Sequence, residues 1–108
     1  MTPIKFSPEA LEDLQGIRRY IAGELGNEQA AANTVAKVMK RVKELEMFPE
    51  MGSPLSARVR LATDYRYLVC GNYTAFYRLE SGTVLVVRVL YGRRDFMKTL
   101  FGELPEDN

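Results

Sequence analysis

The chain has 108 residues, of which 46% are hydrophobic, and its formal net charge is +1. This length predicts one domain over residues 1–108, with enough apolar content to bury a core. The sequence has no histidine and one cysteine, which excludes His-dependent nucleophiles, internal disulfides and zinc sites built from His and Cys. We therefore expect no metal and no cofactor.

The sequence also carries no signal for a membrane. No apolar run approaches the length that spans a bilayer, and the first ten residues lack a charged-then-apolar targeting pattern. The expectation is a cytoplasmic protein with no membrane partner.

The first half of the chain predicts a short strand followed by a helical hairpin. Residues 3–6 are expected to be extended, and Ser7 then caps a helix with Pro8 at its first position and Gly26 just past its end. Apolar residues recur at helical spacing along this helix: Leu11, Leu14, Ile17, Ile21 and Leu25.

Asn27 predicts the cap of a second helix over residues 28–48, directly after the first. Its apolar stripe consists of Ala31, Val35, Val38, Met39, Val42 and Leu45. The short connection makes the two helices an antiparallel hairpin. Lysine and arginine side chains occupy the outer side of this helix. We interpret them as a solvated face rather than a nucleic-acid surface, because three glutamates share the same segment.

The second half predicts three antiparallel strands. A Pro/Gly-rich loop covers residues 49–54, and residues 55–63 are either a loose edge strand or an ordered loop. Strands are then expected over 65–69, 73–79 and 83–91. Gly71-Asn72 and Ser81-Gly82 form the tight turns between them. Asp95 is the predicted cap of a last short helix over 96–101, followed by a frayed acidic tail.

The order of these elements is β-αα-βββ(-α), which is an α+β fold. A helical hairpin is expected to pack on one face of a small, mostly antiparallel sheet. The other face is predicted to be open and to carry the functional site. Both alternating sets of residues 83–91 are largely apolar, so this strand should lie inside the sheet. Arg88 then needs a carboxylate partner, either Glu80 or an acid on a neighbouring strand.

Basic residues gather on and beside the three strands. Between Arg58 and Lys98 there are eight basic and three acidic side chains. Arginine binds phosphates and carboxylates through its planar fork of donors. The candidate partner-binding side chains are Arg66, Arg88, Tyr91, Arg93, Arg94 and Lys98. The alternative is that they form structural ion pairs on a solvated sheet.

Several stretches together resemble the RelE/ParE superfamily of bacterial toxins, some of which are named plasmid stabilisation proteins. They are DLQGIRRYIAGELGNEQAA in the hairpin, FPEMGSP after it, and YRYLVCGNYTAFYRLESGTVLVVRVLYGRRD over the strands. The resemblance implies the toxin of a type II toxin–antitoxin pair, which arrests growth and is neutralised by a cognate antitoxin. A homodimer and a toxin–antitoxin hetero-oligomer both fit this expectation.

The superfamily has two branches with different targets. RelE-like members cut mRNA on the ribosome, whereas ParE-like members poison DNA gyrase. Here Thr74 stands where the RelE pattern has an arginine. Arg94 is retained and Arg93 replaces a lysine, but Leu100 or Phe101 lies where a catalytic tyrosine is usual. The strand residues therefore favour the ParE-like branch.

Two other interpretations stay open at this point. The first is a metal-independent, ribosome-dependent mRNA endoribonuclease with Arg94, Arg93 and Tyr91 as candidate catalytic residues. Such a reaction needs a base, an acid and a charge stabiliser, and no set of residues here supplies all three convincingly. The second is a toxin-like fold that has lost its toxicity.

Overall fold

The computed structural model describes residues 1–92 and 96–102, and it has an α+β architecture built on a mixed five-stranded sheet. The strand order is β1-β5-β4-β3-β2, with β1 parallel to β5 and the other pairs antiparallel. The strands are β1 (Ile4–Phe6), β2 (Ser53–Pro54), β3 (Arg66–Cys70), β4 (Tyr73–Glu80) and β5 (Thr83–Tyr91). The predicted fold class is confirmed.

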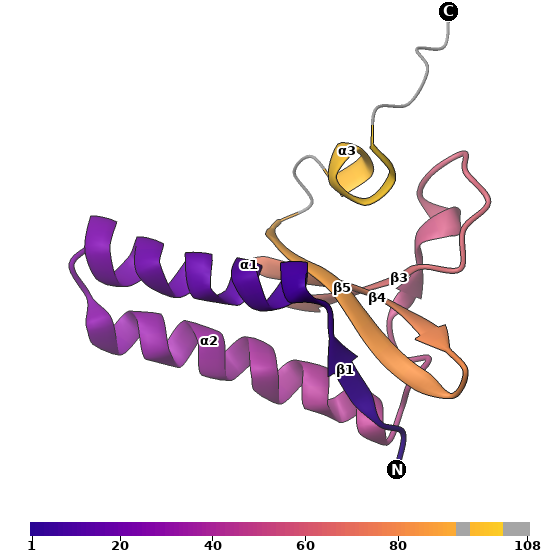
Figure 1. Cartoon of the computed structure of the whole chain (residues 1–108), viewed down its shortest axis with the longest axis horizontal. Helices are drawn as coiled ribbons and strands as arrows, with labels where there is room; N and C mark the ends of the chain where they lie inside the picture. Colours follow the sequence, from indigo (N-terminus) through magenta and orange to yellow (C-terminus); the bar gives the residue numbers. More distant parts are fainter. Residues whose placement is uncertain (93–95, 103–108) are drawn as a thin grey trace, which may run out of the picture.

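Two helices run side by side over one face of this sheet, and their joined ends extend past the strands (Figure 1). Helix α1 (Pro8–Arg19) continues into a π-helical turn, Tyr20–Glu24, and α2 (Glu28–Lys43) continues into a 3-10 turn, Glu44–Glu46. The Oγ atom of Ser7 accepts a hydrogen bond from the Ala10 amide, and Oδ1 of Asn27 accepts one from the Ala30 amide. Both predicted N-caps are confirmed, whereas the predicted end of the second helix at residue 48 is too late.

The main core lies between the helices and the sheet. It contains the buried residues Ala10, Leu14, Val38, Val42, Leu45, Leu68, Cys70, Ala75, Tyr77, Val84, Val86 and Val89. Three members of the predicted stripes are instead exposed, namely Leu11 (49%), Leu25 (60%) and Met39 (40%). Ala10 rather than Leu11 faces the sheet. The π-helical turn changes the helical phase before Leu25 is reached.

The second face of the sheet is covered over part of its area, so the prediction of an open face was wrong for that part. Phe96 of α3 (Phe96–Phe101) stacks on Phe76 with ring centroids 5.6 Å apart, and Phe101 stacks on Tyr65 at 5.4 Å. Leu55, in a 3-10 turn over Leu55–Ala57, is buried beside them. The segment 55–63, predicted as either strand or loop, is thus this turn followed by irregular backbone. Strands that are apolar on both faces need cover on both, and these segments supply it around Phe76 and Tyr65 but not at Val69, which is 54% exposed.

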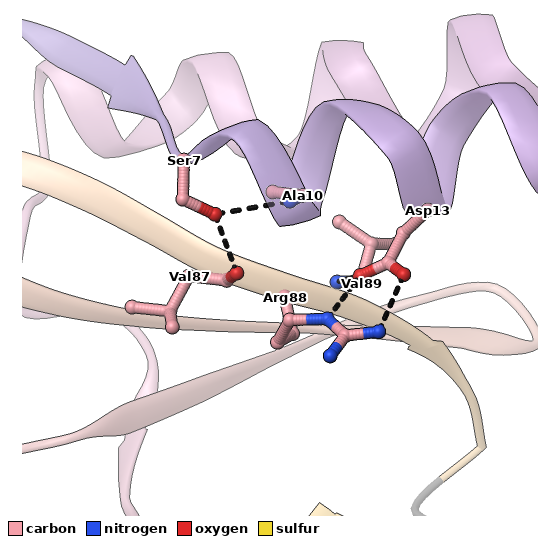
Figure 2. A network of polar contacts seen from close by, with 6 residues as sticks. All are labelled: Ser7, Ala10, Asp13, Val87, Arg88 and Val89. Atoms are coloured by element: carbon pink, nitrogen blue, oxygen red, sulfur yellow. Dashed lines mark hydrogen bonds and ion pairs between the residues drawn. The ribbon is translucent and has the colours of Figure 1, made fainter. Parts of the chain in front are cut away.

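A β-bulge interrupts the side-chain alternation of β5. Phe76 pairs with Arg88 and Tyr77 pairs with Val86, which leaves Val87 without an opposite residue. The carbonyl of Val87 instead accepts a 2.7 Å hydrogen bond from the Ser7 hydroxyl (Figure 2). Beyond the bulge, Val89 rather than Arg88 points into the main core.

A buried tyrosine fixes the loop between α2 and the sheet. The hydroxyl of Tyr77 donates to the Pro49 carbonyl at 2.8 Å and accepts from the Gly52 amide at 2.9 Å. A Cβ atom on Gly52 would lie 2.7 Å from the Tyr77 ring and 2.8 Å from the carbonyl oxygen of Tyr67. Glycine is therefore required at this position by close packing.

Candidate binding surfaces

A groove separates the tip of the helical hairpin from the ends of β3, β4 and β5. Its volume is about 970 Å³, and it is bordered by Tyr20, Leu25, Lys37, Tyr73 and Tyr91, among others. Tyr20 (55%), Leu25 (60%) and Tyr91 (57%) are all substantially exposed. Lys37 is the one charged side chain among the described residues that line the groove. Exposed apolar surface of this extent, with a single cation, is typical of a protein-binding groove.

The backbone of the hairpin tip explains why these apolar side chains are exposed. The π-helical turn Tyr20–Glu24 buries Ile21 but leaves Tyr20 outside. Gly26 then adopts φ of +60°, which a side chain rarely tolerates, and reverses the chain into α2. The groove wall is thus built by the turn itself and does not depend on a partner.

Tyr91, a predicted site residue, lies at the end of β5 on the rim of the groove. Its ring contacts Tyr73 edge-to-face, with centroids 5.5 Å apart and planes at 78°. Burial raises the pKa of Tyr73 above its usual value, and the nearby Tyr91 raises it further. A tyrosine in this environment stays protonated at neutral pH, so it serves as apolar wall and hydrogen-bond donor.

Arg88, another predicted site residue, is held by Asp13 of α1 (Figure 2). Its Nε and Nη2 atoms each donate to the carboxylate at 2.7 Å, and the same carboxylate accepts the Val89 amide at 2.9 Å. Hydrogen bonding to Asp13 raises the pKa of Arg88. The predicted partner, Glu80 or an acid on a neighbouring strand, was wrong. The carboxylate comes from a helix, because β1 ends at Phe6 and α1 covers the remaining edge of β5.

The opposite edge of the sheet is closed in a similar way. The carbonyl of Val69 on β3 accepts a hydrogen bond from Nε of Arg41 on α2 at 3.3 Å. Each helix therefore places a charged side chain on a strand edge that would otherwise present unpaired backbone groups. Such capping disfavours the addition of a further strand at these positions.

The other predicted site residues fall in different places. Arg66 donates to the carbonyls of Glu50 (3.1 Å) and Gly52 (2.7 Å), so its guanidinium holds the loop before β2. Lys98 is exposed on α3. Arg93, Arg94 and the predicted cap Asp95 lie outside the described residues. The structure thus brings Tyr91 to a groove and gives Arg66 and Arg88 intramolecular partners.

Sequence reasoning missed the groove residues Tyr20, Leu25 and Lys37. Leu25 lay on a predicted buried stripe, and only the π-helical turn, which has no local sequence signature, exposes it.

Among the residues that the structure describes, no three His, Cys, Asp or Glu side chains cluster as metal ligands would. Within the same residues, no helix is long and apolar enough to cross a membrane.

This fold is shared by several solved structures from toxin–antitoxin systems. Solved structures with this arrangement include the chromosomal ParDE toxin–antitoxin system from P. aeruginosa. It is 20% identical, covers 85% of this chain and 97% of its own, and has a TM-score of 0.71. The RelBE2 toxin–antitoxin complex from Mycobacterium tuberculosis is 22% identical, covers 83% and 96%, and has a TM-score of 0.60. The RelB–RelE complex from Methanococcus jannaschii is 14% identical, covers 93% and 98%, and has a TM-score of 0.50.

These likenesses establish the fold, and a family model narrows the identification. Residues 4–96 match the model of the ParE toxin of type II toxin–antitoxin systems. The chain therefore belongs to the ParE toxin family. No curated protein matches it.

Proposed function

We propose that this chain is a toxin that binds and poisons DNA gyrase in the cytoplasm, and that a cognate antitoxin neutralises it by occupying the groove. Membership of the ParE family supports the first part. The exposed apolar walls of the groove carry the second part, because a surface of this kind is stabilised when a partner covers it.

The chemistry of the groove indicates what the antitoxin presents. Tyr20, Leu25 and Tyr91 would contact one apolar face of an amphipathic segment. Lys37 would attract an acidic side chain at the edge of that face. The expected assembly is a toxin–antitoxin hetero-oligomer, and a homodimer of the free toxin through the same groove is the competing arrangement.

The choice of gyrase over mRNA depends on what surrounds Thr74. Thr74 is 2% exposed and lines a pocket in which the described residues supply one arginine and no carboxylate. In-line RNA cleavage needs a base, a stabiliser for the phosphorane and an acid. Ribosome-dependent endoribonuclease activity stays the alternative, with Arg93, Arg94 and Tyr91 as its candidate groups, because Tyr91 is exposed and the arginine pair follows it closely in the sequence.

Expression of the chain alone in a bacterial host separates these functions. Transcript 5′ ends and plasmid topology are measured in the same cells, with Arg94→Ala as the comparison. A gyrase poison gives relaxed or cleaved plasmid and a DNA-damage response with intact transcripts. In-frame mRNA breaks with normal topology, lost on Arg94→Ala, would instead make the chain a ribonuclease. Unaffected growth with neither signal would contradict the toxin assignment.

Groove occupancy has its own test. The antitoxin is the co-expressed small protein that restores growth, and its co-purification with the toxin is measured. Leu25→Lys is expected to weaken co-purification strongly, because it places a charge in the apolar wall. Leu11→Lys is the matched control, since Leu11 is an exposed leucine of α1 that does not line the groove. Equal effects of the two changes would refute the groove as the docking site.

A further inference from the structure

A second pocket lies beyond the groove, around the turn between β3 and β4. It measures about 440 Å³ and is lined by Arg58, Tyr67, Val69, Thr74 and Tyr91, with glycines and Asn72 at its rim. Thr74 pairs with Val69 on β3 and with Leu90 on β5, and Leu90 packs in the second core. The pocket floor is therefore the sheet face that points away from α1 and α2.

The hydroxyl of Thr74 is the first sign that the pocket receives a ligand. The residue is 2% exposed and lines the pocket, yet its hydroxyl forms no hydrogen bond with any of the described residues. Among the described residues, Nε of Arg78 is the buried side-chain nitrogen or oxygen that lacks a hydrogen-bond partner, so the Thr74 hydroxyl is not sealed from solvent and opens into the pocket. A ligand with an acceptor oxygen in the pocket would accept a hydrogen bond from this hydroxyl.

Arg58 is the second sign. It follows the 3-10 turn Leu55–Ala57 and donates its amide to the Leu55 carbonyl, while Leu55 and Val59 are anchored in the second core. Its guanidinium carbon lies 5.8 Å from the ring centroid of Tyr67. This stacking orients the planar fork and leaves its edges available.

Several arginines of the described residues are held by carboxylates, whereas Arg18, Arg58 and Arg60 are not, and of these three Arg58 lines the pocket. Arg19, Arg41, Arg78 and Arg88 form ion pairs with carboxylates. Within residues 1–92 and 96–102, Arg58 has no carboxylate partner. A guanidinium with available edges beside an unpaired hydroxyl is suited to an anion with two acceptor oxygens.

We propose that this pocket binds an Asp or Glu side chain of the antitoxin, on a segment that leaves the groove and passes around the Gly71-Asn72 turn. The proposal rests on the proposed antitoxin partnership. The groove and the pocket share Gly71, Asn72 and Tyr91, so one continuous segment reaches both. The carboxylate accepts from Arg58 through one oxygen or both, and from the Thr74 hydroxyl.

A polypeptide carboxylate fits the pocket better than an RNA phosphate. RNA strands are bound through several cations along the backbone, and the described residues place one in this pocket. Val69, 54% exposed, adds an aliphatic wall that suits the residue next to the acid. The capped carbonyl of Val69 also means that the segment crosses the sheet face rather than extending the β3 edge.

The test uses the full chain labelled with ¹⁵N and follows the Arg58 side-chain signal and the amides of Asn72 and Gly92 by NMR. The probes are N-acetyl-Glu-Leu-amide, its Gln-Leu counterpart and the dinucleotide UpA. Of the three probes, only the Glu peptide is expected to cause saturable shifts of these signals. Arg58→Gln should weaken its binding about tenfold, or 1.4 kcal/mol, and Thr74→Val should weaken it several-fold. Arg60→Gln, a change of the neighbouring arginine that does not line the pocket, should have no effect.

Several results would overturn the proposal. Equal binding of the Glu and Gln peptides would exclude a carboxylate site, and preferential binding of UpA would make the pocket a nucleic-acid site. Equal losses for the Arg58 and Arg60 variants would indicate diffuse charge rather than a pocket. If the Glu peptide binds but Arg58→Gln leaves the affinity for the antitoxin unchanged, the antitoxin assignment fails while gyrase poisoning stands.

Discussion

Replacement of Asp13 by alanine should be among the most destabilising single changes in α1. The change leaves the Arg88 guanidinium without its two 2.7 Å hydrogen bonds and the Val89 amide without its acceptor. The two side chains are 27% and 13% exposed, so the pair is largely but not fully buried. Breaking a buried pair costs about 3–5 kcal/mol, and partial solvent access reduces this to about 2–4 kcal/mol. Urea unfolding followed by circular dichroism measures the loss.

Glu12→Ala is the matched control, because Glu12 is the adjacent acid on the same helix and also pairs with an arginine, Arg19. Both side chains of that pair are more than 60% exposed, so solvent screens it and the expected change is within about 0.5 kcal/mol. The double change Asp13→Ala with Arg88→Ala should cost less than the sum of the single changes. If Asp13→Ala destabilised the protein no more than Glu12→Ala, the account of the β5 edge would be refuted.

Three further predictions concern buried groups, each measured by the same urea unfolding. Tyr77→Phe should cost about 1–2 kcal/mol, because the Gly52 amide loses its acceptor and the Pro49 carbonyl loses its donor; no loss would mean that the hydroxyl does not hold this loop. Gly52→Ala should cost about 1–3 kcal/mol, since its Cβ would lie 2.7 Å from the Tyr77 ring; a neutral result would contradict this close packing. Burial raises the pKa of the Cys70 thiol to about 11 from 9.0, so the folded chain keeps a proton that the unfolded chain loses, and stability should fall as pH rises from 9 to 11. Cys70→Ala should make this fall shallower, and an unchanged pH dependence would count against the thiol as its source.

Local signals predicted most of the secondary structure correctly. The caps Ser7 and Asn27 and the tight turn at Ser81-Gly82 depend on residues close together in sequence, and each is where the pattern placed it. Ser81 and Gly82 both adopt positive φ, as the expected turn requires. These features follow from backbone preferences that a short window of sequence contains.

Features that depend on distant contacts were not predictable in the same way. Arg88 and Asp13 are 75 positions apart, so no periodicity relates them. The bulge at Val87 changes which residues of β5 face the helices, and apolar residues on both faces of the strand concealed that change. The cover supplied by α3 turned part of the expected open face into a second core. The toxin family was recognised from the sequence resemblance, whereas the groove could be identified only from the three-dimensional arrangement of the helices and strands.

The most direct test of gyrase poisoning uses purified components. The purified chain is added to DNA gyrase, relaxed plasmid and ATP, and supercoiled and cleaved plasmid are quantified with and without the antitoxin. The account predicts loss of supercoiling or accumulation of gyrase-dependent cleaved DNA, reversed by the antitoxin. Full gyrase activity at a stoichiometric excess of the chain, together with cleavage of mRNA on translating ribosomes, would contradict it.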